Sequence, residues 1–125
     1  MDKKKILIVD DEEDICTYSR SILEKTGRFE VAVTTSAPQG LQLARTLFPD
    51  LIVLDVNMPE IDGGGIAQEL GKSDATRNIP ILFVTGLLKK DELPSGQIGR
   101  HHFIAKPVEP KQLIAEIDLL LLGGD

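Results

Sequence analysis

The sequence predicts an α/β fold: a doubly wound, five-stranded parallel sheet in the order 2-1-3-4-5, with helices on both faces. Three unbroken apolar runs, at 6–9, 51–54 and 81–84, are typical of strands buried on both faces of a parallel sheet. Segments with helical patterns follow the expected strands in turn. Strand followed by helix throughout implies right-handed crossovers, and the most apolar strands belong in the middle of the sheet.

The first strand, at 6–9, is followed by an acidic run and then by a helical pattern that continues to Gly27. Residues of this segment recur at intervals of three and four, which predicts an inward-facing stripe. Gly27 occupies the place of a helix C-cap glycine. We expect the stripe to consist of Ile15, Tyr18, Ile22 and Thr26, with Ser19 and Leu23 beside it.

The second strand and the second helix are expected within residues 30–48. Val31 and Val33 alternate with their neighbours, a pattern typical of a half-exposed edge strand. Ser36 suits a helix N-cap, and Pro38 suits the first helical turn. The helix should stop before Pro49 and turn these residues inward: Leu41, Ala44, Leu47 and Phe48.

The central strand, at 51–54, ends at Asp55. A buried helix has a similar composition, but Pro49 before the run and Pro59 and Gly63 after it leave no room for one. The strand therefore delivers the Asp55 carboxylate to the carboxyl edge of the sheet, where ligands bind in open α/β sheets. A short helix is expected at 63–71, with an apolar side made of Ile66, Ala67 and Leu70.

Two further strands are expected in the last third of the chain. The strand at 81–84 ends at Thr85, and a short strand at 102–105 ends at Lys106. Between them, Pro94 and Gly96 interrupt a weak helical pattern, so a fourth helix there is expected to be short or irregular. Pro110 opens a final helix, whose apolar stripe consists of Leu113, Ile114, Ile117, Leu120 and Leu121.

Length and composition favour one soluble domain spanning residues 1–125. The net charge of −6 and the isoelectric point of about 4.9 argue against a nucleic-acid or anionic-membrane partner. Cys16 is the single cysteine, which excludes a disulfide framework and a cysteine zinc site. No apolar stretch approaches the ~20 residues of a membrane span and no signal peptide follows Met1, so we expect a cytoplasmic protein.

Three acidic residues are expected to meet at the topological switch point, between the first and third strands. These are Asp10, Asp11 and Asp55. Two unit charges about 4 Å apart repel by roughly 4 kcal/mol at an effective dielectric constant of 20, so the cluster needs protons or a cation. Oxygen ligands with no His or Cys nearby favour a hard divalent ion, with Mg²⁺ first.

Two other strand ends add complementary groups, the Thr85 hydroxyl and the Lys106 ammonium, which suits phosphate. With a carboxylate nucleophile and Mg²⁺, they would form a site for phosphoryl transfer to Asp55. Each residue also has a simpler explanation: Asp10 or Asp11 as a helix cap, Thr85 as a turn residue and Lys106 as a solvated lysine. Their joint occurrence at predicted strand ends favours the shared site.

Four segments carry a resemblance to a known family: ILIVDDEEDI at 6–15, DLIVLDVNMPEIDGGG at 50–65, ILFVTG at 81–86 and FIAKPV at 103–108. Together and in this order, they resemble the receiver domain of bacterial two-component response regulators. The resemblance covers essentially the whole chain, and the receiver fold has the same 2-1-3-4-5 sheet.

The resemblance implies a role for each acidic residue. Asp55 would be the phospho-acceptor and Asp11 a direct Mg²⁺ ligand, while Asp10 would act mainly through water. The main-chain carbonyl of Asn57 would complete the ligands that the protein supplies.

The resemblance also implies a switch. Lys106 would pair with the phosphoryl group, Thr85 would be the switch hydroxyl, and Phe103 would be the rotating aromatic residue of the last strand. The Lys106–Pro107 peptide bond is expected to be cis.

The implied phosphodonor is a phosphohistidine on a sensor kinase or a phosphotransfer domain. The first helix would offer the docking face, with Asp14, Ile15 and Tyr18 near its start. The protein would then be a signalling phospho-acceptor in a phosphorelay and not an enzyme.

Two alternative functions remain open at this point. A haloacid-dehalogenase-type phosphatase also uses a strand-end Asp, but it normally needs a second Asp where this chain has Asn57. The other alternative is a receiver-like interaction module that works without phosphate. A stand-alone regulator and a receiver within a longer chain both fit the sequence. The apolar residues 119–122 suggest either a homodimer or continuation into an output domain.

Overall fold

The computed structural model describes residues 3–56, 63–86, 97–98 and 101–122. Its sheet has the strand order β2-β1-β3-β4-β6-β5. The parallel strands are β1 (Lys4–Val9), β2 (Phe29–Thr34), β3 (Leu51–Asp55), β4 (Ile81–Thr85) and β6 (His101–Ala105). The described helices are α1 (Glu13–Lys25), α2 (Ala37–Leu47), α3 (Gly63–Gly71) and α4 (Pro110–Leu121).

The predicted order 2-1-3-4-5 is confirmed, with β6 as the fifth parallel strand. The order 2-1-3-4-5 would make this strand a sheet edge, which is wrong, because β5 (Gln97–Ile98) adds a sixth, antiparallel strand beyond it. An antiparallel neighbour needs no crossover helix, and two residues carry too little pattern to be recognised in a sequence. A short or irregular helix was expected within 87–100. Only residues 97 and 98 of this segment are described, and they form β5.

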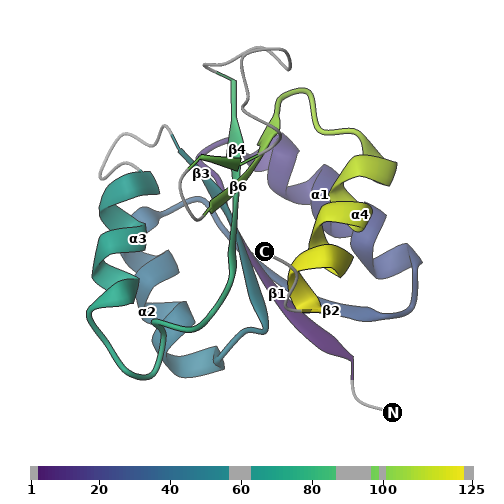
Figure 1. Ribbon diagram of the computed structural model, residues 1–125. Coiled ribbons are helices and arrows are strands. Elements are labelled where there is room, and N and C mark those ends of the chain that lie inside the picture. Colours follow the sequence, from purple (N-terminus) through teal and green to yellow (C-terminus); the bar gives the residue numbers. More distant parts are fainter. Residues whose placement is uncertain (1–2, 57–62, 87–96, 99–100, 123–125) are drawn as a thin grey trace.

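The described helices cover the sheet on both faces, α1 and α4 on one and α2 and α3 on the other (Figure 1). Successive strand residues alternate between these two layers, as the two-residue period of a strand requires. Ile6 and Ile8 pack under α1 and α4, whereas Leu7 and Val9 belong to the other core. The sheet is therefore buried on both faces, as the unbroken apolar runs predict.

The inward face of α1 differs from the prediction. Its buried residues are Cys16, Ser19 and Leu23, while Tyr18 is 45% exposed. Small side chains at positions 16 and 19 let the helix lie close to the sheet, which leaves the larger Ile15 and Ile22 at the flanks. The predicted stripe was thus displaced by about one residue.

The end of α2 also differs from the prediction. Ser36 caps the helix by accepting a hydrogen bond from the Gln39 N–H at 3.3 Å, as expected. Leu47 and Phe48, however, are exposed at 37% and 62%. The helix ends at Phe48, which precedes Pro49, because a residue before proline avoids the right-handed helical region. Phe48 adopts the left-handed conformation, with a φ of 49°.

The predictions for α3 and α4 are confirmed. Ile66 and Leu70 of α3 are buried in one core, and Leu113 and Ile117 of α4 are buried in the other. The other predicted α4 residues, Ile114, Leu120 and Leu121, pack against the edge of the same core. No helix in the described ranges is long and apolar enough to cross a membrane.

The strand register brings the carboxyl ends of the parallel strands to one level. Val9 lies opposite Leu54, and Asp55 lies opposite Val84. Thr85 in turn lies opposite Ala105, the last residue of β6. Groups that follow these strand ends are therefore neighbours, although up to about a hundred residues separate them in the chain.

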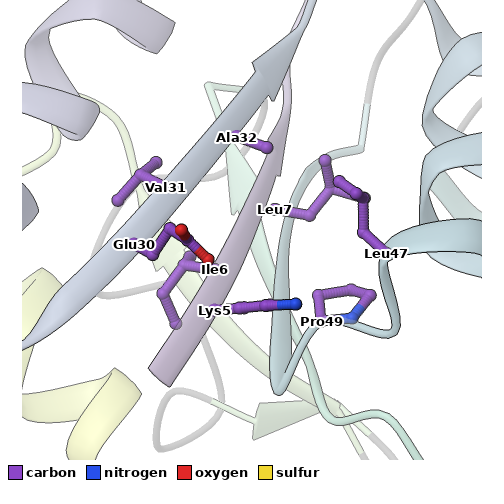
Figure 2. A pocket seen from close by; sticks show the side chains of 8 residues that line it. All are labelled: Lys5, Ile6, Leu7, Glu30, Val31, Ala32, Leu47 and Pro49. Carbon is purple, nitrogen blue, oxygen red and sulfur yellow. The ribbon is translucent and has the colours of Figure 1, made fainter. Parts of the chain in front are cut away.

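A depression of about 340 Å³ lies at the other end of the sheet (Figure 2). It is formed by the first halves of β1 and β2, by Leu47 at the end of α2 and by Pro49 just after that helix. Its side chains come from both faces of the two strands, with Ile6 and Val31 on one side and Leu7 on the other. This depression therefore lies away from the carboxyl edge of the sheet.

Candidate functional site

Three carboxylates meet at the carboxyl edge of the sheet. One ligand oxygen from each of Asp10, Asp11 and Asp55 lies within 4.8 Å of the other two. Asp55 ends β3 and Asp10 directly follows β1, so the register places both side by side. Asp10 and Asp55 are buried, and Asp11 is exposed. The cluster therefore has a solvent side, through which a ligand can enter.

The Asp10 side chain is fixed by its surroundings. Its backbone N–H donates to the Thr34 carbonyl at 3.2 Å, and its Oδ1 accepts the Glu12 N–H at 2.9 Å. Burial raises the pKa of Asp10, more than the Glu12 N–H and the Lys106 ammonium lower it. The N-cap of α1 is Glu12, so Asp10 shapes the turn into the helix and points its other oxygen at Lys106.

Lys106 links the acidic groups. Its Nζ lies 3.3 Å from Asp10 Oδ2 and 3.7 Å from Asp55 Oδ2. Its backbone N–H donates to the Thr85 carbonyl at 2.8 Å, and the Lys106–Pro107 bond is cis, as expected. Burial lowers the pKa of Lys106, but the hydrogen bond to Glu12 and the charges of Asp10 and Asp55 outweigh it, so the pKa is raised. The ammonium therefore remains charged.

The charges of this cluster favour a cation. Three carboxylates and one ammonium leave a net negative charge in a partly buried space. The donors are all carboxylate oxygens, which are the ligands of hard divalent ions such as Mg²⁺. The acidic cluster thus could hold a metal, and its chemistry fits Mg²⁺ better than a softer ion.

Thr85 and Phe103 occupy the neighbouring strands. Thr85, the last residue of β4, is fully buried directly beside the end of β3. Phe103 of β6 is partly buried and stacks on Phe83 of β4, with ring centroids 5.0 Å apart and an interplanar angle of 20°. Both residues lie where the sequence places them, at and near the ends of adjacent strands.

One residue of the cluster was missed by the sequence analysis. The Glu12 carboxylate lies 2.6 Å from Lys106 Nζ, closer than either aspartate. The only signal was its place directly after Asp10 and Asp11, which is too general to assign a partner. Asn57, the expected carbonyl ligand, lies outside the described residues.

This fold and this cluster define a class of protein. The chain matches the family model described as "Response regulator receiver domain" over residues 6–118. The chain therefore belongs to the response regulator receiver family, and its recognition from four short segments is confirmed.

Two transcriptional regulators, one of them named as probable, are similar to the chain. It is 37% identical over 124 residues to "Probable transcriptional regulator ycf27" of Porphyra purpurea, covering 98% of the chain and 49% of the relative. It is 34% identical to the alkaline phosphatase synthesis transcriptional regulatory protein PhoP of Bacillus subtilis, covering 94% and 48%. The chain thus spans about half the length of these relatives.

A solved structure supports the same fold. It is the response regulator receiver domain protein (CheY-like) from Methanospirillum hungatei, which is 29% identical to the chain with a TM-score of 0.83. The match covers 98% of this chain and 96% of that one. The chain is therefore a receiver domain of the kind found in two-component signalling systems.

Proposed function

We propose that the protein accepts a phosphoryl group on Asp55, in a Mg²⁺-dependent transfer from a phosphohistidine of a sensor kinase or a phosphotransfer domain. The observation that carries the proposal is the convergence of three carboxylates with the Lys106 ammonium at the sheet edge. Membership of the receiver family supports the same function. The 125 residues would act as one receiver domain and as a stoichiometric acceptor, not as an enzyme with turnover.

In the proposed step, a carboxylate oxygen of Asp55 attacks the phosphorus atom of the donor. The new O–P bond forms while the P–N bond of the phosphohistidine breaks, and the leaving imidazole nitrogen keeps the electron pair and is protonated from solvent. Asp55 is buried at a strand end, so its carboxylate is held in one place for this attack.

The neighbouring residues would stabilise the transferring group. Lys106 would donate a hydrogen bond to a phosphoryl oxygen. The metal would be held by Asp10, Asp11, Asp55 and the carbonyl of Asn57, with Asp10 acting mainly through water. A bound Mg²⁺ would neutralise charge on the phosphoryl oxygens.

The proposed switch uses Thr85 and Phe103. The Thr85 hydroxyl would turn toward the new phosphoryl oxygens, since phosphorylation leaves the pocket with more negative charge. Phe103, which is only partly buried against Phe83, would then move into the space that Thr85 leaves. Thr85→Ala should still accept phosphate, but the Phe103 ring signals in its NMR spectrum should not shift on phosphorylation.

The proposed docking face for the phosphodonor is the start of α1. Asp14 and Tyr18 are exposed there, and Ile15 is partly buried between them. Because the similar proteins named above are transcriptional regulators about twice as long, we propose that the receiver controls an output domain, in the same chain or through a homodimer.

Intact-mass measurement after incubation with Mg²⁺ and phosphoramidate tests the function. We expect one phosphoryl group on the parent protein, none on Asp55→Asn, and none when EDTA replaces Mg²⁺. Asp74→Asn is the matched control, because Asp74 is an exposed acid outside the cluster and should leave labelling unchanged. A phosphoryl group on Asp55→Asn would contradict the assignment, and repeated turnover of a phosphate ester would favour the phosphatase instead.

A further inference from the structure

Among the acids that the structure describes at the site, Glu12 holds Lys106 most closely. The distance from Lys106 Nζ is 2.6 Å to Glu12, 3.3 Å to Asp10 and 3.7 Å to Asp55. We propose that this Glu12–Lys106 ion pair is a latch, which must open before Lys106 can bind the phosphoryl group. Glu12 is then a positioning residue that slows phosphorylation, an inference that rests on the proposed function.

The backbone geometry shows that Glu12 is directed toward this contact. Glu12 occupies the N-cap position of α1, yet its side chain makes no capping hydrogen bond. Its N–H is held by Asp10 Oδ1 at 2.9 Å, which fixes the place from which the side chain starts. The carboxylate reaches across the mouth of the site to a residue 94 positions away in the chain. Shorter side chains usually cap a helix, so a longer Glu is suited to the reach.

The position of the Lys106 ammonium makes the latch an obstacle. Its shortest contact is with Glu12, at 2.6 Å, whereas the distance of 3.7 Å to Asp55 Oδ2 is too long for a hydrogen bond. The ammonium is thus held on the Glu12 side of the site. To donate a short hydrogen bond to a phosphoryl oxygen on Asp55, it has to move toward Asp55 and loosen its contact with Glu12 or with Asp10.

Burial decides which contact is released. The Glu12 side chain is 58% exposed, whereas the Asp10 and Asp55 side chains are each 3% exposed. An exposed carboxylate that leaves its ion pair rotates into the solvent and is hydrated again, so breaking the contact costs little free energy. A buried carboxylate that loses its partner is not hydrated, so breaking its contact costs more. Glu12 is therefore the contact that opens.

Phosphorylation rates of four proteins test the latch: the parent, Glu12→Gln, Glu12→Asp and Glu13→Gln. Each is incubated with Mg²⁺ and phosphoramidate, and labelling of Asp55 is followed by intact mass. Glu12→Gln removes the charge, while Glu12→Asp keeps the charge but is too short for the 2.6 Å contact. We expect both to be labelled about two- to fivefold faster than the parent, the range for a partly exposed ion pair.

Glu13→Gln is the matched control, since Glu13 is the adjacent exposed acid and forms no ion pair with Lys106 among the described residues. It should be labelled at the parent rate. A second readout is the affinity for beryllofluoride, a phosphoryl analogue, in the presence of Mg²⁺. The latch predicts tighter binding by both Glu12 variants, which a purely structural role of Glu12 would not produce.

The outcomes separate the latch from the function on which it rests. If Glu12→Gln is faster but Glu12→Asp equals the parent, the effect is one of charge alone and the latch is wrong. Equal rates for all four proteins, or slower labelling of both Glu12 variants, would also overturn it. If the parent takes no phosphoryl group on Asp55, the proposed function fails instead.

Discussion

Asp10 is a carboxylate that folding removes from water. Burial raises its pKa above the ordinary value, in spite of the opposing Glu12 N–H and Lys106 ammonium. The folded state therefore binds this proton more tightly than the unfolded chain does. As pH rises through the interval between the unfolded and folded pKa values, stability falls, and the ionised Asp10 remains unfavourable at neutral pH.

Asp10→Asn is accordingly expected to stabilise the protein in the absence of divalent ions. The amide oxygen can still accept the Glu12 N–H, and Lys106 keeps its contacts with Glu12 and Asp55. The free energy of unfolding, measured by urea denaturation at pH 7 with EDTA, should rise by about 1 kcal/mol, the size of a typical single-site effect. Glu13→Gln, which removes a favourable charge from the first turn of α1, should not stabilise. A less stable Asp10→Asn protein would contradict this explanation.

The Cys16 thiol is expected to be unreactive in the folded protein. It is 2% exposed, and burial together with the nearby Asp10 charge raises its pKa to about 11. At pH 8 only about one thiol in a thousand would be ionised, and the thiolate is the reactive form. Ellman's reagent should therefore label the native protein very slowly and the urea-unfolded protein within the mixing time. Rapid labelling of the native state would show that α1 is not packed as described.

The sequence was sufficient to locate Asp10, Asp11, Asp55, Thr85 and Lys106, because each stands at or directly after the end of a predicted strand. The predicted strand order then places these strand-end residues together at the carboxyl edge of the sheet. Glu12 could not be found in this way. Its contact with Lys106 depends on the turn into α1 and on the direction of a flexible side chain, neither of which a strand pattern contains.

At the scale of whole elements, the α2 helix lies unusually close to β1. A Cβ atom added at Gly40 would lie 2.8 Å and 3.0 Å from the two terminal methyl carbons of Val9. Val9 is β-branched and buried, so its side chain has little freedom to move. The small residues Ala37, Gly40 and Ala44 form the buried side of α2, which permits this approach.

Gly40→Ala should therefore destabilise the protein, although alanine favours helices over glycine by about 1 kcal/mol. Overpacking costs about 1–3 kcal/mol, so we expect a net loss of about 1 kcal/mol in the free energy of unfolding. Gly71→Ala is the matched control, because nothing lies within 4 Å of its added Cβ, and it should be neutral or stabilising. Adding Val9→Ala to Gly40→Ala should relieve the contact; strict additivity of the two effects would contradict the close approach.

Helix positions were easier to predict than helix orientation. Proline and glycine mark the ends of α2, α3 and α4, so their bounds follow closely from the sequence. The inward face of α1 was misplaced because Cys16 and Ser19, two small residues, pack more deeply than the larger Tyr18. Hydrophobicity ranks Tyr18 above Ser19, whereas close packing against a sheet favours the smaller side chain.

At the scale of the whole molecule, Mg²⁺ should stabilise the fold. An ion that binds only the folded state adds about 2.7 kcal/mol at a concentration of 100 times its Kd. The thermal midpoint of the parent should therefore rise with MgCl₂, at constant ionic strength. Asp11→Asn should lose most of this rise and keep the midpoint of the parent in EDTA, since Asp11 is exposed. An equal rise in both proteins would place the ion elsewhere.

The sheet as a whole was predictable because its strands are apolar and alternate with helices, a pattern that fixes both direction and order. β5 was not predictable, since a two-residue antiparallel pairing leaves no periodic signal. The proposed function depends on strand ends that lie side by side at one edge of the sheet. The strand register confirms this arrangement for β1, β3, β4 and β6.

The most direct test of the account is to identify the phosphorylated residue. An aspartyl phosphate is reduced by borohydride to homoserine, which peptide mass spectrometry can locate. After treatment with Mg²⁺ and phosphoramidate, we expect homoserine at position 55 and nowhere else in the chain. Homoserine at Asp10, Asp11 or Glu12, or at position 55 to the same extent without Mg²⁺, would contradict it.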